Sequence, residues 1–133
     1  MAKSKAKIEL GKLIMAHRTL EAYAKERVCV KLAYKIFLFR KKASEHEEFF
    51  SGKVNGIIKE YSLKDDAGKT KYDENGNALI DKAKIEECKK AIAEVENLKV
   101  EKPSLDFTLE ELSEIKMSVE DLARLEDFIR EEE

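Results

Sequence analysis

The chain has 133 residues, of which 41% are charged and 43% hydrophobic. This length fits one domain with a real core, and the balance is that of a soluble helical protein rather than a disordered one. The longest apolar run, residues 28–39, contains two lysines and is too short to span a bilayer. The basic start is broken by Glu9 and Lys12, unlike a signal peptide, so we expect a cytoplasmic protein with no membrane partner.

The net charge of -2 hides an asymmetry along the chain. Residues 1–43 carry twelve Lys/Arg against three Glu, and residues 44–133 carry fourteen Lys/Arg against twenty-five Asp/Glu. Such polarity predicts either head-to-tail attraction between copies or an acidic partner for the basic end.

Residues 2–7 form a short basic tail, and the apolar spacing predicts a first helix from Ile8 to about Glu26. The β-branched stretch at residues 27–30 is a break that makes a helical hairpin of residues 8–62. Its second helix is unusually long. Apolar residues recur every three or four positions from residue 31 to 61, with His46 completing the series: Leu32, Ile36, Phe39, Ala43, Phe50, Val54, Ile57 and Tyr61.

The start of this long helix is apolar on a second side as well, through Tyr34, Phe37 and Leu38. A helix with two apolar faces is either wedged between neighbours or forms an oligomer interface.

After Tyr61 the apolar residues no longer recur with the spacing of a helix. Residues 69–72 and 78–80 flank Asn75-Gly76, the strongest short signal for a hairpin, so a β-hairpin is predicted over 69–80. The aspartates of this region resemble a calcium loop, but Gly76 comes too early for one, and we interpret the stretch as a turn.

Asp81 has the character of an N-cap for a helix over residues 82–97, whose inner face is Ile85, Cys88, Ile92 and Val95. The alternation of residues 98–100 could supply a third strand beside the hairpin.

The segment of residues 104–133 is acidic. Thr108 with Glu111, and Ser118 with Asp121, are capping signals for a single turn holding Leu112 and for a terminal helix. This helix is expected to bury the following residues: Val119, Leu122, Leu125, Phe128 and Ile129. Residues 131–133 are expected to be disordered. The fold class is therefore mainly α, with a small β element (α+β).

The order of these elements resembles small uncharacterised helical proteins encoded by tailed phages and prophages, over roughly residues 10–129. The resemblance rests on these stretches: Lys31-Leu32-Ala33-Tyr34-Lys35-Ile36, Ile58-Lys59-Glu60-Tyr61, Lys64-Asp65-Asp66, Asp73-Glu74-Asn75-Gly76, Thr108-Leu-Glu-Glu-Leu and Asp121-Leu-x-x-Leu-Glu-x-Phe-Ile. It implies a phage context, hence a virion or assembly component or a protein that binds a host factor. It supplies no activity and no catalytic residue.

The residues that carry chemistry are few. His17 and His46 have no further His or Cys at ligand spacing, so both are expected to be core or boundary residues and no metal is predicted. Cys29 and Cys88 are expected to be buried and reduced, with a disulfide between them as the alternative. Without any nucleotide-binding, hydrolase or metalloprotease motif, we expect no enzyme and no cofactor.

Three functions remain. The first is a non-catalytic module that binds a host or phage protein, and in its sharper form inhibits a host defence machine. The second is a virion or assembly component that acts as a homo-oligomer, and the third is a nucleic-acid binder. The predicted partner-binding residues are Tyr34, Phe37, Leu38, Asp106, Glu110, Glu111 and Glu114. The predicted phosphate-binding residues are Arg40, Lys41 and Lys42.

Overall fold

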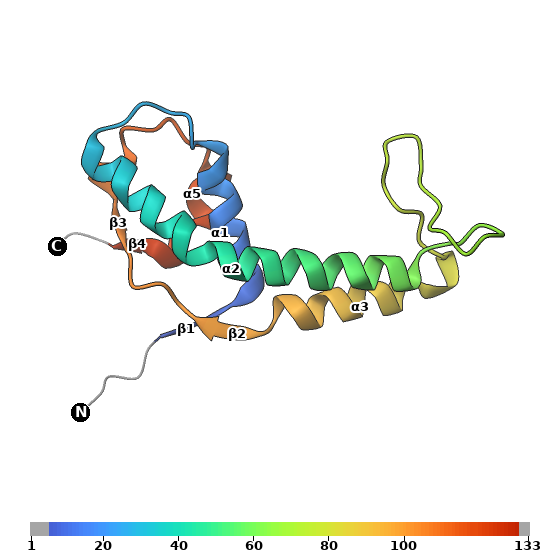
Figure 1. Cartoon of the computed structure of the whole chain (residues 1–133). Coiled ribbons are helices and arrows are strands. Elements are labelled where there is room, and N and C mark those ends of the chain that lie inside the picture. Colours follow the sequence, from blue (N-terminus) through green and yellow to red (C-terminus); the bar gives the residue numbers. More distant parts are fainter. Residues whose placement is uncertain (1–5, 131–133) are drawn as a thin grey trace.

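The long helix is the axis of the fold, and the computed structural model describes residues 6–130 around it. The N-terminal half of α2 (Val30–Tyr61) lies in a body with α1 (Leu10–Ala22) and the C-terminal segment. Its C-terminal half forms an arm with α3 (Ile85–Glu96), and this arm projects from the body (Figure 1). The described residues therefore have the mainly helical α+β fold that the sequence predicts.

The apolar seam of α2 is buried where two layers cover it. Leu32, Phe39 and Ala43 are fully buried in the body. Farther along, Val54 and Ile57 are only half-buried. Val54 packs against the cluster of Leu10, Ile14 and Phe50, and beyond it α2 runs beside α3 in the arm. The spacing thus predicts the face correctly, while the number of neighbours decides how deeply each residue is buried.

The predicted first helix, residues 8–26, is too long at both ends. Ile8 lies instead in β1 (Lys7–Glu9), which pairs antiparallel with β2 (Lys99–Glu101). In this ladder the β-branched Ile8 is buried opposite Val100, so strand pairing prevails over the helical period. The segment after α3 therefore pairs with the N-terminal strand, and the predicted third strand of the hairpin does not form among the described residues.

Gly11 allows α1 and α3 to meet end to end along α2. A Cβ atom at this position would lie 3.0 Å from the Glu96 Cβ and 3.3 Å from its carbonyl oxygen. These distances are shorter than ordinary van der Waals contacts, so a larger residue would require Glu96 to shift by a few tenths of an ångström, and the glycine permits the close approach.

The core of the body is an aromatic cluster to which the C-terminal segment contributes two rings. The Phe39 ring lies edge-on against Phe128, with 4.8 Å between ring centroids, and 6.1 Å from Phe107. All three side chains are fully buried. The segment adds five short elements: β3 (Phe107–Thr108), α4 (Leu109–Leu112), α5 (Val119–Arg124), η2 (Glu126–Phe128) and β4 (Ile129–Arg130). β3 and β4 are parallel, and this pairing holds both ends of the segment beside α2.

Both capping signals of this segment are confirmed, but the predicted burial is only partly right. Thr108 and Glu111 form a capping box at α4, and the Ser118 hydroxyl accepts from the Asp121 backbone N–H at α5. Leu125 is fully buried, as expected, whereas Val119 is 86% exposed. Two further residues that were expected to be buried are not. Leu122 is 36% exposed, and Ile129 is half-buried in β4. α5 ends after six residues, and of the predicted stripe only Leu125, which caps this helix, and Phe128 in η2 are buried in the core.

The arm ends in a tip, residues 62–81, that replaces the predicted hairpin 69–80. Only isolated antiparallel bridges form there, one of them between Tyr72 and Ala78 across the predicted Asn-Gly turn. Leu63, Lys71 and Leu79 lie in three chain segments that hydrogen-bond in a closed ring. Each backbone N–H donates to the carbonyl of another, at 2.7–2.9 Å. Three segments that share hydrogen bonds in this way leave no register for a two-stranded ladder.

The tip is an internal repeat with a period of eight residues, which was missed in the sequence. The Asp65 side chain accepts from the N–H groups of Ala67 and Lys69, and the Asp73 side chain accepts in the same way two and four residues on. Gly68 and Gly76 follow with φ values of 80° and 82°, which only glycine adopts at low cost. Asp81 repeats the first contact with Ala83 and thereby starts the next element as predicted.

Beyond Asp81 the chain forms η1 (Lys82–Lys84) and then α3. On the predicted inner face of α3 only Cys88 is buried, while Ile85, Ile92 and Val95 are half-buried. The arm has two helical layers at this point, so these side chains remain partly open to the solvent. The predicted tail at residues 2–7 lies mostly outside the described residues, as do residues 131–133.

Replacing Asp73 with alanine should open one turn of the tip. Because two backbone N–H groups lose their acceptor, we expect a cost of about 1–2 kcal/mol, confined to the tip. The measurement is amide hydrogen exchange at Asn75 and Asn77, which should become faster. Asp66→Ala changes a neighbouring aspartate that accepts no hydrogen bond among the described residues, so equal exchange in the two variants would contradict the assignment.

Candidate functional site

The acidic C-terminal segment is held against the start of α2 by Lys35. Its Nζ donates to the Glu111 carboxylate at 2.7 Å and to the Asp106 carbonyl at 3.0 Å. Burial alone would raise the pKa of Glu111, but the hydrogen bonds from Lys35 and Thr108 outweigh it and hold this pKa below its usual value. Glu111 is thus an ionised structural link between the basic and acidic parts of the chain.

Glu114 is also used within the chain. Its carboxylate accepts from the backbone N–H of Cys29, the residue that precedes α2, at 3.0 Å. A polar cavity of about 650 Å³ lies between these elements and is lined by all four predicted acidic residues: Asp106, Glu110, Glu111 and Glu114. The structure therefore brings them together, but commits the carboxylates of Glu111 and Glu114 to internal contacts.

An apolar groove lies on the outer side of the same segment. It has a volume of about 340 Å³ and is lined by Leu109, Val119, Leu122, Ala123, Glu126 and Ile129. Leu109 is 53% exposed and Val119 is 86% exposed, which is unusual for large apolar side chains gathered in one place. The sequence pattern predicts that three of these six residues, Val119, Leu122 and Ile129, lie in the core, because a helical stripe does not reveal where its helix stops.

The groove has an acidic rim and a fixed position. Glu126 lines it, and Glu110 and Glu120, the sequence neighbours of Leu109 and Val119, are exposed, with the Glu120 carboxylate 3.9 Å from the Arg124 guanidinium. The Tyr23 hydroxyl donates to the Asp121 carboxylate, which joins α5 to the end of α1 and raises the pKa of Tyr23. The groove is therefore presented by elements anchored in the core rather than by a free loop.

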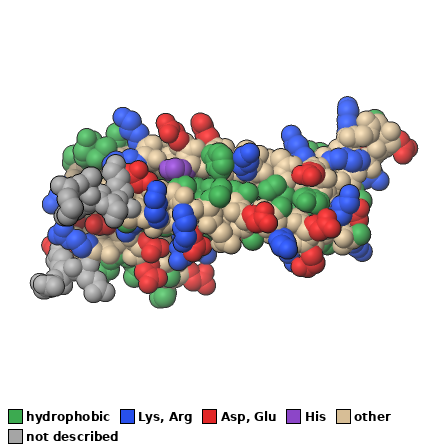
Figure 2. All heavy atoms as spheres, turned by 90° about the horizontal axis from the view of Figure 1, so that it is seen from below, with side chains coloured by type: hydrophobic (Ala, Val, Ile, Leu, Met, Phe, Trp, Pro, Cys, Tyr) green, Lys and Arg blue, Asp and Glu red, His purple; other side chains and the backbone are tan. Residues whose placement is uncertain are grey.

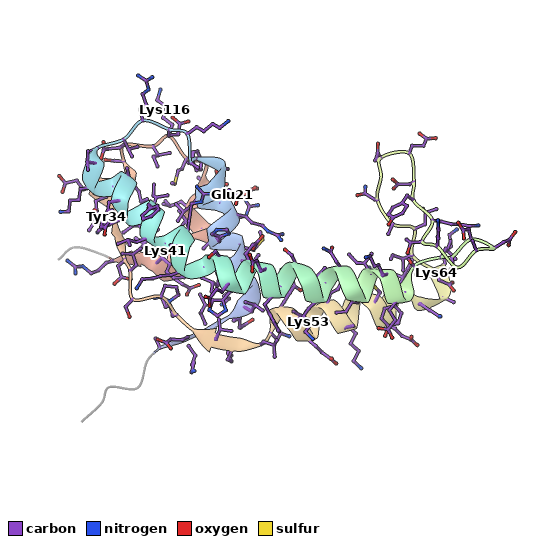
Figure 3. All side chains as sticks on the ribbon, in the orientation of Figure 1. Glu21, Tyr34, Lys41, Lys53, Lys64 and Lys116 are labelled. Atoms are coloured by element: carbon purple, nitrogen blue, oxygen red, sulfur yellow. The ribbon has the colours of Figure 1, made fainter. Side chains whose placement is uncertain are left out.

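The second predicted surface, on α2, is also exposed. Tyr34 and Phe37 are 58% and 57% exposed, and their rings stack with 6.2 Å between centroids. Leu38 is half-buried. Figure 3 places Tyr34 and Lys41 along the N-terminal half of α2, far from Lys64 at the tip of the arm.

The predicted phosphate-binding residues do not face the same way. The Arg40 guanidinium lies 3.9 Å from the Glu21 carboxylate on α1, whereas Lys41 and Lys42 are exposed. Folding also mixes the charges that the sequence separates. On the face seen in Figure 2, acidic and basic side chains alternate from the body to the arm.

His17 is buried between α1 and α2, as expected for a core residue. Its Nδ1 lies 3.8 Å from a Glu47 oxygen, and Arg18 donates to the other oxygen at 3.0 Å. Burial lowers the pKa of His17, and the nearby charges of Glu47 and Glu21 only partly oppose this shift. His46 is half-buried on the next part of α2.

Cys29 is exposed, so the prediction that it is buried is wrong; it precedes α2 instead of packing in a helical stripe. Cys88 is buried, and both thiols are free. Among residues 6–130, no group of three or more His, Cys, Asp or Glu side chains is arranged to hold a metal ion. No helix in this part of the chain is long and apolar enough to cross a membrane.

The chain matches no protein-family model, no curated protein and no solved structure. The argument for function therefore rests on the surfaces described above.

His17 should make the stability of the protein pH-dependent. Its pKa lies below 6.5 in the folded chain, so the unfolded chain takes up the proton first as the pH falls. The free energy of unfolding is expected to be highest above about pH 6.5 and to decrease below it. Urea unfolding between about pH 5 and 7.5 measures this slope.

The control for this experiment is the other histidine. His17→Gln should flatten the slope between about pH 5 and 6.5, and His46→Gln, which leaves His17 in place, should retain it. A slope that is equal in both variants and the parent would show that His17 does not cause it.

Proposed function

We propose that this protein is a non-catalytic protein-binding module that uses the apolar groove of its C-terminal segment. The observation that carries the proposal is the exposure of Leu109, Val119 and Leu122 in one groove on a well-anchored segment. Exposed apolar groups that gather in a concave place gain most from a partner that removes them from water.

The acidic rim indicates the chemistry of the partner. Glu126 lines the groove, and Glu110 and Glu120 are exposed next to Leu109 and Val119 in the sequence, so the surface fits an amphipathic helix with an apolar stripe and basic flanks. Charges at a rim mainly accelerate and orient the encounter, whereas the buried apolar contacts hold the complex together.

The resemblance to small phage-encoded proteins supports a host or phage protein as this partner. A phage protein with an acidic docking surface suits a target with a basic surface, such as a host defence machine that binds nucleic acid. In this proposal a basic helix of that target docks in the apolar groove of the module, in the cytoplasm of the host cell.

The role of a homo-oligomeric virion or assembly component is the second candidate. It is favoured by a different observation, the stacked and exposed pair of Tyr34 and Phe37 on α2.

Replacing Leu122 with glutamate should weaken binding of the partner to the groove. A carboxylate in the centre of the groove must be buried without a counter-ion, so we expect a loss of affinity of about tenfold or more. The tagged protein is used to capture partners from nuclease-treated host lysate, and affinity is then measured with the purified partner. Leu98→Glu is the matched control, because Leu98 is 45% exposed and lies outside the groove. Equal capture by both variants would exclude the groove.

Reversing the charge of the exposed glutamates beside the groove should slow association with the partner. With Glu110, Glu120 and Glu126 all changed to lysine, association with the partner should become slower and lose most of its dependence on salt. Stopped-flow or surface-based kinetics at two salt concentrations measures both effects. The control variant carries the same three reversals at exposed residues of the arm: Glu60, Glu86 and Glu94. If the control slows association as much, only the net charge matters.

A further inference from the structure

Two glycines in the middle of α2 have no role within the described chain. A Cβ atom added at Gly52 or Gly56 would meet nothing within 4 Å, and neither has a positive φ. Each costs the helix about 1 kcal/mol relative to alanine. At Gly11, by contrast, a close contact with Glu96 explains the residue. The two glycines therefore leave a shallow recess on an exposed face of a long helix.

The same face of α2 carries the exposed aromatic residues. With 3.6 residues per turn, Lys41, Glu48, Gly52 and Gly56 all fall within about 40° of Tyr34 around the helix axis. Phe37 stacks on Tyr34 at the edge of this face. Two aromatic side chains thus lie toward one end and two glycines toward the other, with one lysine and two glutamates, Lys41, Glu45 and Glu48, between them.

A groove borders this face and contains unpaired polar atoms. It lies between α1 and α2, has a volume of about 820 Å³, and is lined by Phe37, Lys41, Ser44 and Glu48 among others. His17 Nδ1, Arg40 Nε and Glu47 Oε2 are buried in it without a hydrogen-bond partner. They are three of only four such atoms among the described residues. Two of these atoms, His17 Nδ1 and Glu47 Oε2, lie 3.8 Å from each other.

We propose that a second copy of this chain docks here, with the two α2 helices antiparallel. Their two-fold axis passes close to Ser44 and Glu45. Phe37 then faces Gly52 of the second copy, and Tyr34 faces Gly56. Lys41 faces Glu48 of the second copy, and by symmetry each of these contacts is made twice.

The pattern of charge and size is the argument for a second copy rather than another protein. Lys41 and Glu48 are both exposed and make no ion pair among the described residues. Both are equally far from the proposed axis, as are the aromatic residues and the glycines. Apart from Glu45, which would lie beside its own copy at the axis, the face is complementary to itself after reversal, which is the property of an isologous interface. From Tyr34 to Gly56 the contact would extend about 33 Å along α2.

The test is a cycle of charge reversals in the full chain, read by sedimentation equilibrium over a wide range of concentration. Lys41→Glu places two like charges opposite each other twice, and Glu48→Lys does the same. Each should weaken dimerisation by about tenfold or more, and the double variant should restore it. The two residues are too far apart along α2, about 10 Å, for restoration within one copy.

Each outcome decides the proposal. A protein that is monomeric at all concentrations overturns it, as does a dimer that none of the reversals weakens. Single variants that weaken the dimer without rescue by the double variant overturn the antiparallel register. If Phe37→Glu leaves the protein monomeric as before but abolishes capture of another protein, the face binds a different partner.

A second variant separates docking from folding. Gly52→Leu should raise the thermal stability of the helix in either case, because leucine is the better helix former. Only the proposed dimer predicts that it also abolishes self-association, since the side chain fills the recess opposite Phe37. Leu122→Glu is expected to leave dimerisation unchanged, so failure of the dimer and failure of the C-terminal groove are distinguishable.

Discussion

The fold depends on covering one apolar seam along a single helix that no other element matches in length. α2 has 32 residues, whereas α1 has 13 and α3 has 12. The seam is therefore covered by two helices placed end to end, which meet where Gly11 approaches Glu96. The two helices come from distant parts of the chain. The strand before α1 and the strand after α3 pair as the β1–β2 ladder next to their meeting point. Beyond the junction α2 has only α3 beside it, and an arm results (Figure 1).

The body needs a third layer, which the C-terminal segment provides. Phe107 and Phe128 cover Phe39, and the ion pair between Lys35 and Glu111 fixes the segment at its polar edge. The acidic residues nearest to α2 are therefore structural. The outer surface of the segment is where Val119 and Leu122 of α5 remain exposed. The same packing that completes the core thus creates the groove.

The two proposed interaction surfaces are independent of each other. The C-terminal groove combines an apolar centre with an acidic rim and fits a partner of opposite charge. The outer face of α2 carries both charges in a reversible order and fits its own copy. A dimer built through α2 would carry two C-terminal grooves, and two linked grooves bind a repetitive target more tightly than one. An assembly component and a module that binds another protein are thus compatible roles.

The local pattern of the sequence determined the helices and their caps. The long helix, its buried face, the cap at Asp81 and the capping box at Thr108 depend on spacing and side-chain chemistry within one or two turns. The period-eight repeat of Asp65 and Asp73 can also be recognised in the sequence, because each aspartate accepts hydrogen bonds from residues only two and four positions later.

Only the tertiary structure decided which elements meet. Ile8 became a strand because Val100, more than ninety positions away, lies beside it, and the hairpin yielded to a ring that closes through Leu63. Both candidate surfaces have the same origin. Exposure of Val119 and of Tyr34 depends on how many neighbours surround them, and no periodicity encodes that number. The sequence determined the faces of this protein, and packing decided which of them remain open to a partner.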